Sequence, residues 1–375
     1  MQARVAHSVE MPPSRRRRPS PVAMALFPSE KGDPGAKGDL PGTAHSREPL
    51  VGIARLASLS PRAEAKRGVE YFLLPVRSIL NRCDSARVPF PWTINPYRGC
   101  EFGCLYCYAR YTHEYMEIDG GQFERKIYVK RDASAVIDRD LGAEWQPGEH
   151  IAIGTATDPY QPAERDFGVT RSLLERMALR EGLSLSITTK SDQVVRDIEL
   201  LQRIEAHSEL QINISITTLR TGLARLIEPR APRPDLRLAA LKRLREAGLA
   251  AGVFAMPILP GLADSEEDLD RLARAAREAG ALWLGASVLF LMPSSLRQFL
   301  PFVEKRFPRL AERYRRWYVE RNGPPESYRE EIRARIDRLR RRYGLAAGPA
   351  RRTEPRPSAQ LPLSLAMPAP DCSRR

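Results

Sequence analysis

Short apolar runs alternate with longer amphipathic stretches along the middle of the chain. Runs typical of strands occupy residues 151–155, 183–189, 212–217, 251–256 and 283–290, and the stretch 92–97 predicts one more strand before them. Between these runs the apolar residues recur at helical spacing. Short strands that alternate with helices of this length predict βαβ units and a parallel sheet.

Three of the expected helices begin at a capping residue or a proline, and two of these end at a glycine. They span 164–181, the stretch from Ser191 or Asp192 onward, Pro234 to Gly248 and Ser265 to Gly280, with a further helix from Cys104 to Met116. Six strand–helix units predict an α/β fold, a partial (β/α)6 barrel of the TIM type. The active site of such a barrel lies at the carboxyl ends of its strands.

The segments on either side of the barrel differ from it in composition. Residues 51–300 form the expected core, with an apolar lead-in over 68–91 and the barrel over 92–300. Residues 301–344 place aromatic and aliphatic side chains among arginines, which predicts a basic helical extension that Gly323 and two prolines divide in two. The proline-rich stretches 1–50 and 345–375 predict disordered tails.

The net charge of +14 is concentrated outside the core. Residues 51–300 carry 33 basic and 32 acidic residues, whereas residues 301–344 carry 14 and 7. A near-neutral core lacks the basic channel that a nucleic-acid duplex requires, so only weak nucleic-acid binding through 301–344 is expected. No apolar run is long enough to cross a membrane, and no membrane association is expected.

Three of the five cysteines lie in one C-x3-C-x2-C motif, at Cys100, Cys104 and Cys107. Thiolate sulfur is the ligand that iron–sulfur clusters require, and three cysteines on a four-iron cluster leave one iron open for chemistry. Gly99, directly before the motif, and Gly103 within it allow the loop to wrap tightly round such a cluster. An alternative is a zinc site in which His113 completes a Cys3His set.

The other two cysteines, Cys83 and Cys372, are scattered. This distribution argues against a secreted disulfide framework and favours a reducing, cytoplasmic location. No glycine-rich phosphate loop and no H-x3-H pair occur, so kinase and zinc-hydrolase chemistry has no support in the sequence.

The stretch NPYRGCEFGCLYCYAR, residues 95–110, resembles the signature of radical S-adenosylmethionine (SAM) enzymes, in the branch that includes spore photoproduct lyase. The resemblance covers about residues 68–300 and implies a [4Fe–4S] cluster on the three cysteines, with SAM at the open iron. It also implies a one-electron donor such as flavodoxin or ferredoxin, and cleavage of SAM to a 5′-deoxyadenosyl radical. That radical abstracts hydrogen from a substrate that the sequence does not identify.

Polar residues follow the expected strands, where SAM would bind. Oxygen acceptors at Thr157 and Asp158 suit its ammonium group, and Lys190 suits its carboxylate as a point charge. The same residues also fit an Asx-capped turn and an exposed surface lysine. Four further contacts are expected, namely Tyr106 from the family signature, Ser215 at the ribose, Arg230 or Arg237 at the carboxylate or the substrate, and the segment Met256–Gly261 at the adenine.

Two other functions are weighed against this one. A non-enzymatic zinc- or cluster-stabilised nucleic-acid-binding protein would use the tails and the basic helices as its contact surface. A DNA photoproduct lyase follows from the resemblance itself, but that lyase returns hydrogen from a cysteine at the end of the second strand, where Thr155 stands here. The O–H bond of threonine is too strong for this step, and nothing in the sequence places Tyr108 or Tyr160 there. Repair of spore photoproduct is therefore not expected.

Overall fold

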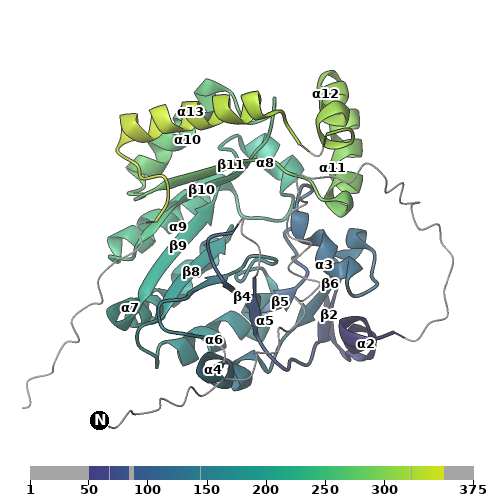
Figure 1. Ribbon diagram of the computed structural model, residues 1–375, viewed down its shortest axis with the longest axis vertical. Coiled ribbons are helices and arrows are strands. Elements are labelled where there is room, and N and C mark those ends of the chain that lie inside the picture. Colours follow the sequence, from purple (N-terminus) through teal and green to yellow (C-terminus); the bar gives the residue numbers. More distant parts are fainter. Residues whose placement is uncertain (1–49, 67, 84–87, 144, 322, 350–375) are drawn as a thin grey trace, which may run out of the picture.

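Six parallel strands form the centre of the computed structural model, which describes residues 50–66, 68–83, 88–143, 145–321 and 323–349 (Figure 1). The strands are β4 (Trp92–Ile94), β7 (His150–Ile153), β8 (Ser184–Thr189), β9 (Glu209–Ser215), β10 (Ala251–Ile258) and β11 (Leu284–Val288). A short antiparallel strand, β3 (Leu80–Arg82), completes the order β11-β10-β9-β8-β7-β4-β3. The two ends of this sheet do not pair with each other, so the barrel is partial, as the sequence predicted.

The predicted strands match the observed ones, and their residues are buried on both faces of the sheet. The apolar residues of β8 and β9 lie in the main core, and the polar residues between them, such as Ser186 and Gln211, are buried as well. The pairs Leu185↔Leu210 and Ile187↔Ile212 join β8 to β9 within the main hydrophobic core. Near-continuous burial of this kind is expected of parallel strands that are covered by helices. The register brings the carboxyl ends of β7, β8 and β9 to one edge of the sheet.

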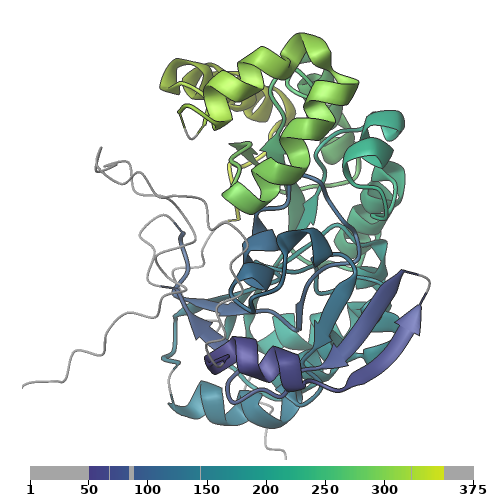
Figure 2. The same cartoon turned by 90° about the vertical axis from the view of Figure 1, so that its right-hand side faces the viewer.

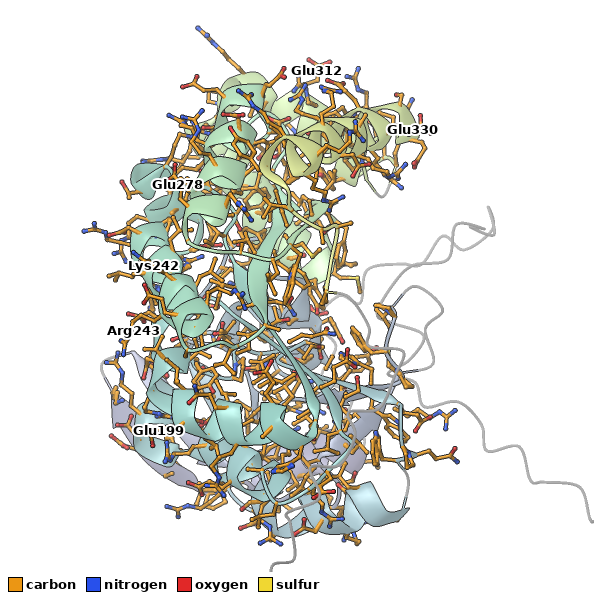
Figure 3. All side chains as sticks on the ribbon, turned by 90° about the vertical axis from the view of Figure 1, so that its left-hand side faces the viewer. Glu199, Lys242, Arg243, Glu278, Glu312 and Glu330 are labelled. Atoms are coloured by element: carbon orange, nitrogen blue, oxygen red, sulfur yellow. The ribbon has the colours of Figure 1, made fainter. Side chains whose placement is uncertain are left out.

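Helices connect the parallel strands and cover the sheet. They are α5 (Ala163–Phe167), α6 (Val169–Met177), the 3-10 helix η3 (Asp192–Asp197), α7 (Ile198–His207), α8 (Thr221–Ile227), α9 (Pro234–Glu246) and α10 (Glu266–Glu278). The helix expected over 164–181 is interrupted at Gly168, which has a positive φ of 60°. Ser191 and Ser265 are N-caps as predicted, since each hydroxyl accepts a hydrogen bond from the first turn that follows. Charged side chains of both signs point outward from these helices, as Glu199 on α7, Lys242 and Arg243 on α9 and Glu278 on α10 show (Figure 3).

A second sheet, of order β1-β2-β6-β5, was not predicted. Its strands are β1 (Arg62–Lys66), β2 (Val69–Leu73), β6 (Lys126–Val129) and β5 (Tyr97–Arg98). The hairpin of β1 and β2 projects from the body beside α2 (Gly52–Leu59), as Figure 2 shows in purple. β5 in the second sheet follows β4 in the first sheet almost directly along the chain. The cysteine loop, which comes after β5, is therefore anchored close to both sheets. The lead-in expected over 68–91 thus contributes β2 to this sheet and β3 to the first one.

Three short helices lie between β5 and β6 along the chain, and a longer one follows β6. They are η1 (Tyr108–Arg110), α3 (Tyr111–Glu114), η2 (Gly120–Gln122) and α4 (Ala133–Ala143). The expectation of one helix from Cys104 to Met116 was wrong, because helical structure begins only at Tyr108. The backbone at Cys107 is extended, with φ and ψ of −64° and 116°, and the cysteine motif is a loop.

Three helices follow the last strand: α11 (Pro293–Arg306), α12 (Pro308–Tyr318) and α13 (Glu326–Tyr343). α11 crosses the expected boundary at residue 300, and Pro308 adds a break that the sequence analysis did not include. Ile332 and Ile336 of α13 pack into the main core beside α10, and the chain then reaches the edge of β11 at Ala346 (Figure 1). The helical extension is therefore part of the packed body.

The expected tails, 1–50 and 345–375, lie almost wholly outside the described residues, as does Cys372. In the described part of the chain, no helix is long and apolar enough to span a bilayer. Many arginines of the extension are engaged in ion pairs there, as Arg315 is with Glu304 and Arg340 with Asp337.

Candidate active site

The three cysteines lie on the loop between β5 and η1. Its turns require glycine, because Gly99 and Gly103 have positive φ angles of 85° and 63°. The Cys107 N–H donates to the Cys104 carbonyl at 3.2 Å, which closes the second half of the loop. Cys100 and Cys104 are buried, whereas Cys107 is partly exposed. The backbone thus fixes all three thiols, and the third lies nearest to solvent.

Side chains from the loop after β7 hold the start of the cysteine loop. The Gly99 carbonyl accepts hydrogen bonds from the Thr157 hydroxyl at 2.6 Å and from the Gln161 amide at 3.1 Å. The Gln161 carbonyl oxygen accepts from the Glu101 N–H at 2.9 Å, so Gln161 contacts the residues on both sides of Cys100. The hydroxyl hydrogen of Thr157, a predicted SAM contact, is therefore used in a hydrogen bond to the cysteine loop.

Arg110, which follows the cysteine motif, holds the loop at Cys104. This side chain is fully buried, and its guanidinium donates to the carbonyls of Cys104 and Gly120, each at 3.1 Å. It also pairs with the Glu124 carboxylate at 2.7 Å. A buried guanidinium with these partners makes strong, charge-assisted hydrogen bonds to the loop backbone.

Asp158 joins the ends of β7 and β8. Its carboxylate accepts hydrogen bonds from the Thr189 hydroxyl at 2.6 Å, from the Tyr160 N–H at 3.0 Å and from the Lys190 N–H at 2.7 Å. Burial raises its pKa, and these donors act in the opposite direction. The carboxylate lies close enough to Cys100 that its charge, after burial itself, raises the pKa of that thiol. Asp158 is therefore an acceptor group beside the first cysteine.

Lys190 places a positive charge beside the second cysteine. Its ammonium lies 5.8 Å from the centroid of the Tyr106 ring, within the range of a cation–π contact. Burial acts to lower the pKa of Lys190, but the negative charges of Cys104, when it is a thiolate, and of Glu228 outweigh this and raise it. Lys190 is thus held in its charged form.

Glu228 is the centre of a buried network that sequence analysis did not predict. Its carboxylate accepts hydrogen bonds from the Tyr106 hydroxyl and from Thr217 at 3.0 Å, and it forms an ion pair with Arg237 at 2.5 Å. Burial opposes ionisation of Glu228, but the charges of Arg237 and then Lys190 outweigh it and lower its pKa. The network fixes Tyr106 through its hydroxyl, and Tyr106 in turn supports Lys190.

The remaining predicted contacts are spread over the same edge. Arg237 is committed to Glu228 and to the Ser215 carbonyl, which it reaches at 3.0 Å, so it belongs to the framework of β9. Ser215 is buried on β9, and Arg230 is exposed and donates to the Glu124 carbonyl at 3.3 Å. The segment Met256–Gly261 ends β10, as expected.

The chemistry of this set fits an iron–sulfur cluster. Burial raises the pKa of Cys104 to about 12, so bare thiols there are neutral, and metal binding is what would hold them as thiolates. Burial also raises the pKa of Cys107, while the charge of Arg110 acts in the opposite direction, as the charge of Lys190 does at Cys104. Positive groups therefore stand where a thiolate-bound cluster would bring negative charge.

The alternative zinc set is not assembled, because His113 is engaged elsewhere. Its Nε2 lies 2.9 Å from the Lys126 carbonyl, and its ring is packed edge-on between Phe123 and Tyr128. Burial lowers the pKa of His113 to about 4. Among the described residues, no three His, Cys, Asp or Glu side chains converge closely enough to hold a single metal ion. Ligands of a four-iron cluster bind different irons and need not converge in this way.

Tyr108 and Tyr160, which the sequence could not place, lie in different surroundings. The Tyr108 hydroxyl donates to the Thr155 carbonyl, directly beside the cysteine loop. The Thr155 hydroxyl accepts from the Asn95 amide at 3.1 Å. Tyr160 lies instead in the main core, fully buried. Of the two, Tyr108 belongs to the site.

Comparisons with known proteins agree with this geometry. Residues 94–273 match the model of the radical SAM superfamily. Uncharacterized proteins of Mycobacterium tuberculosis and Mycobacterium bovis are each 35% identical over 334 residues, which covers 88% of this chain and 94% of theirs. The fold is similar to that of spore photoproduct lyase with bound AdoMet and dinucleoside spore photoproduct, with a TM-score of 0.55 and 19% identity over 73% of this chain and 79% of that one.

Proposed function

We propose that this chain, which belongs to the radical SAM superfamily, holds a [4Fe–4S] cluster on Cys100, Cys104 and Cys107 and binds SAM at the ends of β7 and β8. The chain is a radical SAM enzyme, and members of this superfamily generally use such a cluster and SAM. When bound, the two supply a 5′-deoxyadenosyl radical by one-electron cleavage of the C5′–S bond. The observation that best supports the residue assignment is that Asp158 lies beside Cys100 while Lys190 lies beside Cys104.

The proposed SAM contacts follow from the hydrogen-bonding capacity and the charge that each side chain does not use within the protein. A carboxylate has about four acceptor positions, and Asp158 uses three, so one is left for the SAM ammonium group. Lys190 is charged and is proposed to pair with the SAM carboxylate. Within the described residues the Ser215 hydroxyl makes no hydrogen bond, and we assign it to the ribose. Arg230 is proposed as a further contact at the exposed rim, and Thr157 as a support of the cysteine loop.

Replacing single cysteines tests the cluster assignment. Because three thiolates are the minimum set for such a cluster, Cys104→Ala should lose iron and brown colour after anaerobic reconstitution, and Cys100→Ala and Cys107→Ala should do the same. Cys83→Ala is the matched control, since Cys83 is also a buried cysteine, but lies outside the motif. Iron per chain and the visible absorption spectrum are the measurements. Full iron retention in Cys104→Ala would sink the assignment.

The substrate is proposed to differ from spore photoproduct. Thr155 occupies the position at which a lyase of that kind carries its hydrogen-donating cysteine, and its hydroxyl is bound by Asn95. The Tyr108 hydroxyl donates to the Thr155 carbonyl, and of Tyr108 and Tyr160 it is the better candidate for any hydrogen-atom transfer. The near-neutral residues 51–300 give no basic surface for a duplex.

The partners and location follow from the same chemistry. We propose a one-electron donor such as flavodoxin or ferredoxin, and a cytoplasmic location, because a reduced cluster is sensitive to oxygen. Weak binding of nucleic acid through residues 301–344 stays a prediction, and the ion pairs among those arginines limit the charge that is free for it.

A further inference from the structure

Two positively charged side chains share one face of the second sheet, where β5 meets β6. Arg98 is paired with Tyr128 across the two strands, and Lys130 lies two residues beyond Tyr128 with its N–H bonded to the Pro96 carbonyl at 3.3 Å. Residues two apart on a strand point to the same face, and diagonal neighbours on paired strands lie within reach of long side chains. Arg98 and Lys130 therefore extend from adjacent strands into the same region.

Neither cation has an acidic partner within the described part of the chain. Lys130 is only 5% exposed, yet no hydrogen bond or ion pair of its ammonium occurs there, and the Nε of Arg98 is buried without an acceptor. Buried charges are ordinarily paired, because desolvation of an isolated ion is costly. Burial, followed by the charge of Arg98, lowers the pKa of Lys130 to about 7. Two positive groups at one place, without a partner among the described residues, point to an anion that this part of the chain does not supply.

This region is connected to the cysteine loop by a row of aromatic rings. Tyr108, which follows Cys107, contacts Tyr111 with a centroid distance of 6.4 Å, and Tyr111 contacts Tyr115 at 5.4 Å. Burial raises the pKa of Tyr111, and the nearby charge of Arg98 acts in the opposite direction, which places Arg98 beside this row. Arg98 thus lies one ring beyond Tyr108, the residue that touches the end of β7, and Lys130 lies near Arg98.

We propose that Arg98 and Lys130 bind the phosphate group of a phosphate monoester substrate, with Tyr108 and Tyr111 between this group and the cysteine loop. The proposal rests on the function proposed above and names the chemical class of its substrate. Two positive charges match a phosphate monoester, which carries about −1.5 to −2 at pH 7, better than a carboxylate or a phosphodiester, which carry only one negative charge. Arginine supplies a planar fork of donors for phosphate oxygens, and lysine supplies a point charge.

Binding of four named probes tests this assignment. Calorimetry on the anaerobically reconstituted full chain would use inorganic phosphate, a nucleoside 5′-monophosphate, a dinucleoside phosphodiester without terminal phosphate, and acetate. We expect the monophosphate to bind most tightly and inorganic phosphate to bind measurably. Lys130→Met and Arg98→Met should each weaken the monophosphate by roughly tenfold or more, because each removes charge-assisted hydrogen bonds. Arg125→Met, which removes an exposed charge near the other end of β6, should leave the affinity unchanged.

A stability measurement separates a ligand site from a structural role. Lys130→Met removes an unpaired buried charge, so without phosphate this variant should unfold at a higher temperature than the unchanged chain. Phosphate should stabilise the unchanged chain and not the variant. Equal affinity in Lys130→Met, or equal binding of acetate or of the phosphodiester, would overturn the assignment. Iron content and SAM cleavage are measured on the same preparations. If both are absent while phosphate still binds and this binding requires Lys130, the proposed function is wrong but the phosphate site is correct.

Discussion

Gly99→Ala tests whether the entrance of the cysteine loop has to be glycine. Gly99 has a φ of 85°, and a Cβ atom there would lie 2.7 Å from the Lys126 carbonyl oxygen and 2.8 Å from that of Phe123. Both oxygens belong to the backbone, so neither can move aside as the end of a side chain would. The Cys100 N–H is bonded to the same Phe123 carbonyl at 3.1 Å. Any shift that relieves the overlap therefore displaces the first cysteine.

Two costs add at this position. Left-handed backbone costs an alanine roughly 1–2 kcal/mol, and overpacking in a well-packed interior costs typically about 1–3 kcal/mol. Gly148 is the matched control, because its φ is 90° and a Cβ atom there would meet nothing within 4 Å. We expect Gly99→Ala to lower the free energy of unfolding by about 2–5 kcal/mol and Gly148→Ala by about 1–2 kcal/mol.

The assay compares both variants in two ways. Urea unfolding followed by far-UV circular dichroism gives the free energy of unfolding, and iron analysis after anaerobic reconstitution reports on the cysteine loop. Gly99→Ala should retain little iron, whereas Gly148→Ala should retain as much as the unchanged chain. Equal destabilisation of the two variants, or full iron content in Gly99→Ala, would refute the reasoning.

Three further predictions concern SAM, pH and substrate. Lys190→Met and Asp158→Asn should each weaken SAM binding about ten- to a hundredfold while iron content stays intact. Lys242→Met, which removes an exposed lysine on α9, should leave SAM affinity unchanged. Unchanged SAM affinity in both site variants would contradict the placement of SAM. Burial lowers the pKa of His113 from 6.5 to about 4, so the unfolded chain binds this proton more readily. The free energy of unfolding should therefore fall by roughly 3 kcal/mol between pH 6.5 and pH 4, and urea titrations of cluster-free His113→Phe should show a smaller fall. Reconstituted protein should cleave SAM slowly without substrate. It should not restore thymine in irradiated oligonucleotide, because Thr155 cannot donate the hydrogen atom. Recovery of thymine, measured by chromatography and dependent on Cys100, would contradict the second expectation.

The parallel strands were predictable because their signal is local. β7 and β10 carry short apolar runs, and β8 and β9 carry apolar residues at every second position. Capping serines mark the start of two segments between the strands, and a proline marks the start of another. The cysteine motif was equally visible, since three thiols at fixed spacing have few other uses. The second sheet was missed for the opposite reason. β1 is exposed throughout and β5 has only two residues, so neither carries an apolar pattern.

The supports of the cysteine loop could not be read from the sequence because their partners are distant along the chain. Tyr106 and Glu228 are 122 positions apart, and Gln161 is 62 positions from Gly99. Arg110 follows the motif closely, but an arginine in a polar stretch is usually solvated, and only the packing shows that it is buried. Glu228 stands in a Glu-Pro-Arg sequence that suggests a turn. Burial of a charge with its counter-charge is a property of the assembled fold.

The contact between β11 and the end of the chain has a consequence for self-association. A partial barrel leaves an outer strand whose N–H and C=O groups are a ready template for pairing with another molecule. Here the Leu284 N–H donates to the Ala346 carbonyl, and the Ala346 N–H donates to the Leu282 carbonyl, each at 3.0 Å. The residue that blocks this template comes just after α13, far from the barrel in sequence. A chain shortened before residue 346 would keep every strand of the barrel and every cysteine of the motif, yet it would expose an edge on which copies of the protein can stack.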